Sequence, residues 1–171
     1  SEIFNNDKSQ SEAVKNSYMN AVSIITGGPG SGKTTTLKKL IYIFNKYEKG
    51  KKIIMLAPTG KASKRIDESI NSDEHLKSLN LRKATTIHKL IYQEDYMGET
   101  PSYNDAIFII DESSMIDNNL MCALIKRMEA GCRLVFVGDI DQIPPVGLGQ
   151  IMRDLMNSGK IKISRLTNIH R

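Results

Sequence analysis

Residues 22–36 read Val-Ser-Ile-Ile-Thr-Gly-Gly-Pro-Gly-Ser-Gly-Lys-Thr-Thr-Thr, and this stretch decides the fold. Its β-branched start predicts a strand over 22–26, and the helical periodicity that follows predicts a helix over 33–47. Glycines at 27, 28, 30 and 32 join the two. Because glycine lacks a Cβ atom, these residues let successive backbone N–H groups turn toward a common centre. The stretch therefore predicts a strand, a tight loop and a helix in direct succession.

The loop has the spacing Gly27-x-x-x-x-Gly32-Lys33-Thr34, which is the pattern of a phosphate-binding P-loop. Lys33 adds a mobile positive charge, and Thr34 at the start of the helix can offer its hydroxyl to Mg²⁺. A glycine turn that binds nothing is the alternative, and the strand, the spacing, the lysine and the threonine together disfavour it. The predicted nucleotide contacts are Gly28, Pro29, Gly30, Ser31, Gly32, Lys33, Thr34 and Thr35.

The composition is typical of one soluble globular domain, with 171 residues, 40% of them hydrophobic and 25% charged. No apolar run approaches the roughly twenty residues of a membrane span. The first residues lack the pattern of a signal peptide, so we expect a cytoplasmic protein without membrane contact. The formal charge of +5 permits a polyanionic partner without requiring one. Cys122 and Cys132 have no Cys or His pair at metal-ligand spacing, and we expect reduced structural thiols.

Strand and helix patterns alternate along the chain, which predicts a doubly wound, mostly parallel α/β sheet with its chemistry at the carboxyl edge. Asp7 is the expected N-cap of the first helix, with Gln10 in a reciprocal capping box, and Gly50 is expected to close the helix over 33–47. Residues 84–90 predict a short strand that passes into a helical turn, and 92–105 predict an excursion that could form a small hairpin. The other expected strands are 22–26, 53–57, 106–110, 134–137 and 161–166, and the other expected helices are 7–19, 61–70, 118–129 and 150–157.

The buried strand over 106–110 ends in Asp111-Glu112, which behind a P-loop is the Walker B arrangement. We expect Asp111 to hold the Mg²⁺ shell and Glu112 to polarise an attacking water molecule. Two solvated acids at a strand end are the alternative reading. With the P-loop upstream, the pattern predicts transfer of a phosphoryl group from a nucleotide to water.

A third polar turn, Gly138-Asp139-x-x-Gln142, follows the strand over 134–137. Taken alone, Asp-x-x-Gln is a common structural turn. In P-loop hydrolases of this type, the strand before it lies between the P-loop strand and the Walker B strand. That position would place Gln142 near the γ-phosphate, where an amide can convert the nucleotide state into a loop movement.

Seven stretches resemble, in order, the motifs of superfamily 1 DNA helicases, and they look most like the RecD-type branch, the exodeoxyribonuclease V alpha-chain family. The resemblance covers nearly the whole chain and implies a RecA-like motor domain that uses ATP and Mg²⁺ to move five-prime to three-prime along single-stranded DNA. The stretches are Gln10, Gly-Gly-Pro-Gly-Ser-Gly-Lys-Thr-Thr (27–35), Ala-Pro-Thr-Gly-Lys-Ala (57–62), Thr-Thr-Ile-His (85–88), Ile-Asp-Glu-Ser-Ser-Met-Ile-Asp (110–117), residues 138–149 and Leu-Thr-Asn-Ile-His-Arg (166–171).

The resemblance also implies roles for single residues. Gln10 would contact adenine, and Arg171 would join Lys33, Asp111, Glu112 and Gln142 as a catalytic residue at the γ-phosphate. The implied DNA contacts are Pro58, Thr59, Gly60, Lys61, Thr86, His88, Pro144 and Val146.

The resemblance is to the first motor domain only, over residues 1–171. A second RecA-like domain is therefore an implied partner, and recombination or repair subunits are further candidates. We expect the isolated domain to be inactive in unwinding. Two other readings stay open, namely a nucleotide-binding module that acts only through a partner and a P-loop kinase of small molecules.

Overall fold

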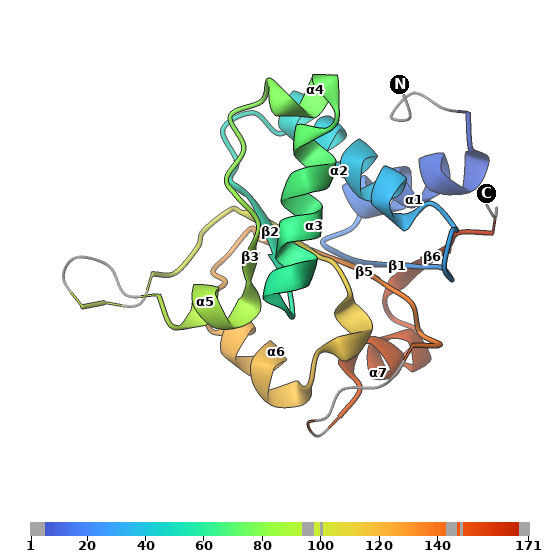
Figure 1. Cartoon of the computed structure of the whole chain (residues 1–171). Coiled ribbons are helices and arrows are strands. Elements are labelled where there is room, and N and C mark those ends of the chain that lie inside the picture. Colours follow the sequence, from blue (N-terminus) through green and yellow to red (C-terminus); the bar gives the residue numbers. More distant parts are fainter. Residues whose placement is uncertain (1–5, 94–97, 100, 143–146, 148, 168–171) are drawn as a thin grey trace.

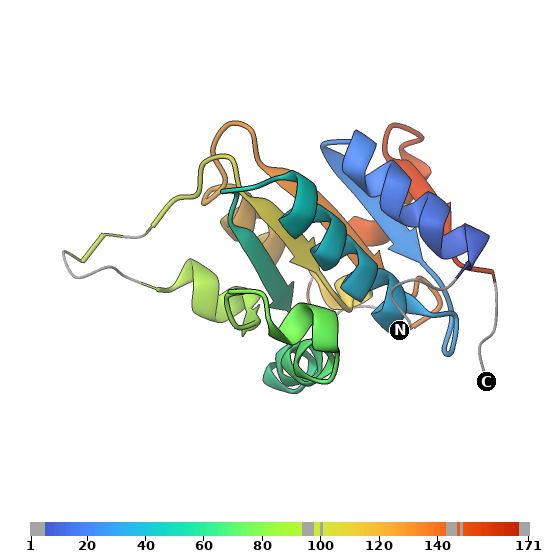
Figure 2. The same cartoon turned by 90° about the horizontal axis from the view of Figure 1, so that it is seen from above.

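The computed structural model describes residues 6–93, 98–99, 101–142, 147 and 149–167, and the structural statements below concern these residues. They form a six-stranded sheet in the order β3-β2-β4-β5-β1-β6, in which neighbouring strands are parallel. The strands run side by side in Figure 2. The strands are β1 (Val22–Thr26), β2 (Ile53–Ala57), β3 (Thr85–Thr86), β4 (Ile107–Ile110), β5 (Arg133–Gly138) and β6 (Lys162–Arg165).

Helices cover both faces of the sheet (Figure 1), so the predicted doubly wound architecture is confirmed. Residues of α1, α2, α3 and α4 pack on one face, and residues of α5, α6 and α7 pack on the other. The helices are α1 (Lys8–Met19), α2 (Lys33–Tyr47), α3 (Gly60–Asn71), α4 (Glu74–Lys77), α5 (Ile87–Ile91), α6 (Asn118–Ile125) and α7 (Ile151–Asn157), and a 3₁₀ turn spans Ser113–Met115.

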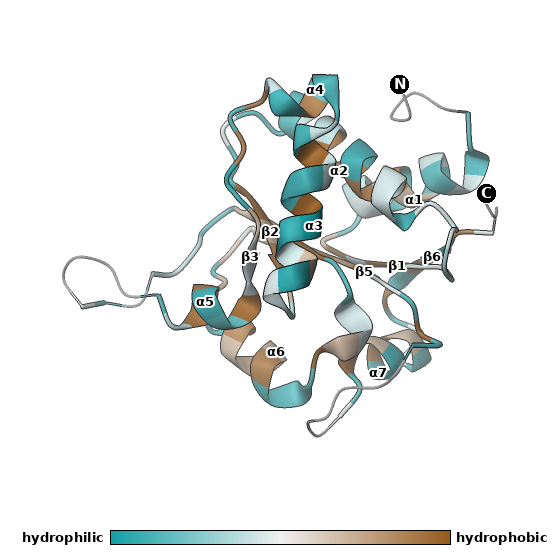
Figure 3. Cartoon of the chain, viewed as in Figure 1, coloured by the Kyte–Doolittle hydropathy of each residue, from teal (hydrophilic) through white to brown (hydrophobic). Residues whose placement is uncertain are grey.

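The strands alternate their side chains between the two faces. Ile107 and Ile109 of β4 face α1 to α4, whereas Phe108 and Ile110 face α5 to α7. All four are fully buried, as a central parallel strand requires. Figure 3 shows the hydrophobic residues gathered along the strands and the inner sides of the helices, with hydrophilic residues outside. The sheet is therefore the centre of the core.

β5 lies between β1 and β4, as predicted, and this order decides where the site forms. The bounds of β1 and β2 match the predicted ones, and those of β4, β5 and β6 differ from them by one residue at one or both ends. One local prediction at a helix end holds, because the carboxylate of Asp7 caps α1 by accepting a hydrogen bond from the Gln10 N–H at 3.1 Å. The predicted cap at Gly50 is wrong, because Glu48 caps α2 by donating its N–H to the Phe44 carbonyl, and Gly50, with a φ of 88°, lies two residues further on.

The predicted helix over 118–129 is too long, because α6 ends at Ile125. Beyond it the backbone tightens, and the Met128 N–H donates to the Ile125 carbonyl at 2.9 Å. This turn brings Met128 alongside Tyr103 in an isolated parallel bridge. Ile125 is 52% exposed, while Met121 is buried.

The excursion over 92–105 contains no strand among its described residues, and 94–97 and 100 lie outside them. The stretch over 71–83, which carries no clear pattern, forms the short helix α4. Asp73 caps it by accepting from the His75 N–H at 3.0 Å.

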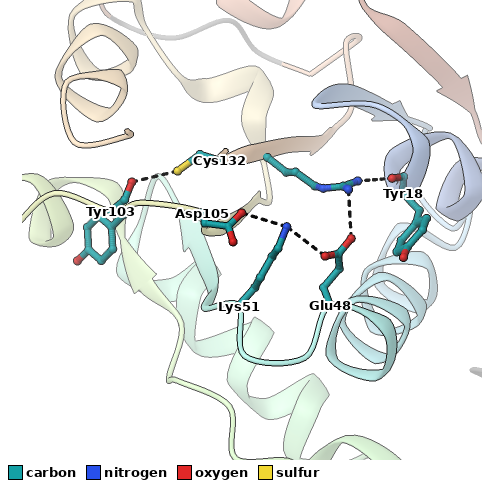
Figure 4. Close-up of polar contacts among 7 residues, drawn as sticks. Tyr18, Glu48, Lys51, Tyr103, Asp105 and Cys132 are labelled. Carbon is teal, nitrogen blue, oxygen red and sulfur yellow. Dashed lines mark hydrogen bonds and ion pairs between the residues drawn. The ribbon is translucent and has the colours of Figure 1, made fainter. Parts of the chain in front are cut away.

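The amino edge of the sheet is closed by a polar network (Figure 4), here called the amino-edge network and made of Tyr18, Glu48, Lys51, Asp105 and Arg133. The Lys51 ammonium lies 3.1 Å from the Glu48 carboxylate and 3.0 Å from that of Asp105. Arg133 reaches Glu48 at 3.1 Å and also donates to the Tyr18 carbonyl. The pKa of the Lys51 ammonium is raised, first by its hydrogen bond to Asp105 and second by its hydrogen bond to Glu48. The network joins the segments that lead into four strands.

Candidate nucleotide site

The glycine loop connects β1 to α2 at the carboxyl edge of the sheet. The Gly27 N–H donates to the Gly138 carbonyl at 3.2 Å, which ties the loop to the end of β5. The Ser31 N–H donates to the Gly28 carbonyl at 3.2 Å and closes the turn. Gly32 then caps α2 with a φ of 87°, a left-handed conformation that favours glycine.

The glycines of the loop serve different purposes. A Cβ atom on Gly27 would overlap the Ser31 hydroxyl and stand 3.0 Å from Leu166 Cβ. Gly30 has a φ of 73°. An added Cβ on Gly28 would meet no protein atom within 4 Å, so the fold alone does not require that glycine. It lies on the exposed rim with Pro29 and Gly30.

The ammonium group of Lys33 points into the loop. Its Nζ donates to the Gly27 carbonyl at 2.6 Å and to the Gly28 carbonyl at 2.9 Å. Ser31 Oγ is buried beneath the loop and has no hydrogen-bond partner. A buried hydroxyl without a partner is uncommon and costly, so the loop holds a donor and a cation toward which anionic oxygen atoms can bind.

Asp111 and Glu112 follow β4 and have different surroundings. Burial raises the pKa of the Asp111 carboxyl, and this effect outweighs the hydrogen bond that its Oδ1 accepts from the Glu112 N–H at 2.8 Å. Glu112 adopts a φ of 50°, which is uncommon for a residue with a side chain. That backbone turn directs the two carboxylates of adjacent residues into one site.

A cavity of about 330 Å³ lies at this edge, and five of the predicted catalytic and metal-binding residues line it. Lys33 and Thr34 come from the start of α2, and the two acids come from the end of β4. The turn after β5 adds Gln142, whose N–H donates to the Asp139 carbonyl at 3.1 Å. The fold thus gathers residues from three distant segments: Lys33, Thr34, Asp111, Glu112 and Gln142.

Arg65 and Ser69 of α3 also line the cavity, although no motif of the sequence predicted them. Arg65 Nη1 lies 3.7 Å from Glu112 Oε1. A signal for them exists in the helix pattern, because Ala62, Ile66 and Ile70 form the buried stripe of α3. Arg65 and Ser69 stand beside that stripe with a spacing of four, on the flank that turns toward β4.

Other predicted residues lie outside this cavity. Gln10 is fully buried in α1 and does not line it. The loop residues Gly28 to Gly32 do not line it either. Thr35 follows Thr34 on α2 and is partly buried. Arg171 lies outside the described residues.

Six of the eight predicted DNA contacts lie on two neighbouring segments. In the parallel register Ala57 pairs with Thr86, so Pro58–Lys61 and Thr86–His88 leave the sheet side by side. The hydroxyl oxygen atoms of Thr59 and Thr86 are N-caps, and they accept from the Ala62 N–H at 3.2 Å and the Lys89 N–H at 3.1 Å. Gly60, Lys61 and His88 are exposed. Pro144 and Val146 lie outside the described residues.

Thr34 and Asp111 fit a magnesium ion by the chemistry of their oxygen atoms, since Mg²⁺ prefers carboxylate and hydroxyl ligands together with phosphate and water. Both line the same cavity. The burial that raises the pKa of Asp111 also fits, because a cation nearby would favour the charged carboxylate. In the described part of the chain, no three His, Cys, Asp or Glu side chains gather into a metal cage.

No helix within the described ranges is long and apolar enough to cross a membrane.

The parallel sheet with helices on both faces, the glycine loop between β1 and α2, and the acids at the end of β4 define the class of a P-loop NTPase with a RecA-like domain. A family model described as an AAA domain matches residues 10–148. The chain belongs to this family.

Two relatives and one solved structure show which members it resembles. An uncharacterized protein of Methanocaldococcus jannaschii, MJ1519, is 37% identical over 86% of this chain. The RecBCD enzyme subunit RecD of Mycobacterium tuberculosis is 29% identical over 95% of it. The crystal structure of a Bacteroides Pif1 in complex with ADP-AlF4 superposes with a TM-score of 0.61, at 21% identity, over 96% of this chain and 42% of that one. These findings confirm the resemblance to RecD-type helicase motor domains.

The chain spans 13% of the length of MJ1519 and 32% of the length of the RecD subunit. It therefore corresponds to one part of longer proteins.

Proposed function

We propose that this chain is the ATP-hydrolysing motor domain of a cytoplasmic DNA helicase that moves five-prime to three-prime on single-stranded DNA. Its partners would be that DNA, a second RecA-like domain, and recombination or repair subunits. The observation that carries the proposal is the convergence of Lys33, Thr34, Asp111, Glu112 and Gln142 on one cavity at the carboxyl edge.

The residues divide the work as follows. The Lys33 ammonium would leave its hydrogen bonds to the Gly27 and Gly28 carbonyls and bind the β- and γ-phosphates of the nucleotide. There its positive charge would offset the negative charge of the phosphates. Thr34 and Asp111 would hold Mg²⁺, which when bound neutralises charge on the phosphate oxygens. The Glu112 carboxylate would orient water and accept its proton. Gln142, on an exposed turn, would bond the terminal phosphate and move when that phosphate leaves.

DNA would bind beside this site. The turn after β2 and the start of α5 lie next to each other, and both belong to the edge that carries the cavity. Helix α3 begins at the proposed DNA turn, with Thr59 as its N-cap, and carries Arg65 into the nucleotide cavity. This helix would connect bound DNA to the Arg65–Glu112 pair.

The first test is the substitution Lys33→Ala. The variant should lose measurable binding of a fluorescent ATP analogue, because the cation in the loop is gone, while its circular dichroism spectrum stays unchanged. Lys46→Ala is the control, since this lysine is exposed near the far end of α2. An affinity equal to that of the unsubstituted chain would refute the assignment of the loop as a phosphate site.

The second test is the substitution Glu112→Gln in a polypeptide that joins this chain to a second motor domain. ATP binding should persist, and turnover stimulated by single-stranded DNA should fall by about 10²–10⁴-fold, because the amide cannot accept a proton. Glu68→Gln, on the exposed side of α3, should leave both properties unchanged. Near-normal turnover in Glu112→Gln would remove this residue as the base.

A further inference from the structure

Tyr92 stands directly after α5 and is 76% exposed, although it is a large aromatic side chain. Its ring lies beside that of His88, one helical turn earlier, with the ring centroids 6.5 Å apart and an angle of 23° between the ring planes. The opposite face of α5 is buried, through Ile87, Leu90 and Ile91. The short helix therefore anchors itself in the core with one face and presents two nearly parallel rings to the outside.

The charge around these rings suits a polyanion. Lys89 is exposed on the same helix, and Lys61 is exposed on the neighbouring turn, which leaves the sheet beside α5 because Ala57 pairs with Thr86. The Gly60 N–H belongs to the first turn of α3, where backbone donors point outward. Surfaces that bind single-stranded nucleic acids combine flat aromatic rings with cations and free backbone donors. The phosphates bind to the cations and donors, and the bases stack on the rings.

We propose that Tyr92, backed by His88, is a stacking platform for one base of single-stranded DNA, next to a phosphate track formed by Gly60, Lys61 and Lys89. This inference rests on the proposed function, in which DNA binds at this edge. It adds that the protein recognises a base of the DNA as well as the phosphates. Stacking needs only the face of a base, so the platform accepts any base and does not read sequence.

The test uses the unsubstituted chain and its variants with a fluorescein-labelled oligothymidylate, followed by fluorescence anisotropy. Tyr92→Leu should weaken binding by roughly 5- to 150-fold, which corresponds to about 1–3 kcal/mol of stacking per base. Tyr92→Phe keeps the ring and should bind like the unsubstituted chain. Tyr47→Leu is the matched control, because that tyrosine is 59% exposed at the end of α2, away from the carboxyl edge.

A second oligonucleotide of equal length with abasic positions separates bases from phosphates. The unsubstituted chain should bind it more weakly than oligothymidylate, and Tyr92→Leu should cause no further loss. Tyr92→Leu should also leave the salt dependence of binding unchanged, whereas Lys61→Gln should reduce the slope of log K against log salt by about 0.7.

The outcomes are distinct. If the unsubstituted chain binds oligothymidylate and Tyr92→Leu binds equally well, the stacking platform is wrong while the proposed function stands. If the unsubstituted chain does not bind single-stranded DNA at all, the DNA part of the proposed function fails, and this inference fails with it.

Discussion

Asp111 and Glu112 are adjacent in sequence, yet their surroundings prepare them for different tasks. Burial raises the pKa of the Asp111 carboxyl. The Glu112 side chain is 30% exposed and faces Arg65 across the cavity. A carboxyl group whose charged form a nearby cation would favour suits a metal ligand. An accessible carboxylate paired with an arginine suits a general base.

The raised pKa of Asp111 makes a prediction about stability. A folded-state pKa above the unfolded value means that protonation favours the fold. This contribution is complete below the ordinary value of 3.8 and is lost as the pH rises through the higher folded-state pKa. Asp111→Asn does not titrate, so its Tm should exceed that of the unsubstituted chain at pH 7, and the difference should shrink as the pH falls toward 4.

Thermal unfolding by circular dichroism at several pH values measures this difference. Asp141→Asn removes the same charge from an exposed position in the turn after β5 and should change Tm little. A Tm difference for Asp111→Asn that is constant from pH 4 to 7 would contradict the burial argument.

The residues of the nucleotide cavity were predictable to different degrees. Lys33 and Thr34 follow from one continuous motif, and Asp111 follows from a buried strand that ends in acids. The prediction that Gln142 lies near the γ-phosphate required the order of the strands as well. Arg65 could not be predicted as a neighbour of Glu112, because their contact depends on how α3 is rotated against the sheet, and local periodicity does not contain that rotation.

At the scale of the elements, Ser113 fastens the two central strands just beyond the acids. Its hydroxyl donates to the Ile110 carbonyl at 2.7 Å and accepts from the Val137 N–H at 3.1 Å, and the residue is buried. One side chain thus fixes the end of β4 against β5. The distance between the acids and the Gln142 turn depends on this connection.

We predict that Ser113→Ala lowers the free energy of unfolding by about 1–3 kcal/mol, because the Val137 N–H is left buried without a partner. Ser114→Ala is the matched control. The neighbouring Ser114 hydroxyl is buried and has no hydrogen-bond partner, so its removal should cost little. Urea unfolding with an unchanged m value measures both effects. Equal losses in the two variants would mean that cavity formation, not the hydrogen bond, decides the cost.

The elements themselves were largely predictable, since β1, β2, β4 and β5 are short apolar runs between turn signals. The residue at which α6 ends was not predictable. Ile125 and Met128 continue the helical pattern, but the bridge between Met128 and Tyr103 ends the helix earlier, and that contact joins residues far apart in sequence. The strand β3 is only two residues long, and its existence depends on pairing with β2.

At the scale of the whole molecule, the two edges of the sheet do different work. The carboxyl edge holds the nucleotide cavity, where polar groups have incomplete partners. The amino edge holds the amino-edge network, where Glu48 serves both Lys51 and Arg133. Arg133 also lies over the Tyr18 ring at 5.4 Å, so the network extends into the packing of α1.

This division makes a prediction for Glu48→Gln. The substitution weakens two ion pairs of a side chain that is 15% exposed, and unfolding should become easier by about 1–3 kcal/mol. The affinity for the fluorescent ATP analogue should not change, because no residue of the network lines the cavity. Glu74→Gln, which removes an exposed partner of Lys77, is the control for loss of charge. A parallel loss of ATP affinity would show that the edges are coupled.

The order of the strands has a consequence for how the protein is made. β1 carries the glycine loop, yet its two neighbours are β5 and β6, the last strands of the sheet. A ribosome that adds about 5–20 residues per second leaves β1 without a partner for roughly 5–20 seconds after it emerges. During that interval its apolar side chains are open to association with other chains, and the loop has no β5 to fix it. Because the Gly27 N–H pairs with the Gly138 carbonyl at the end of β5, we expect the loop to bind nucleotide only after β5 has joined the sheet.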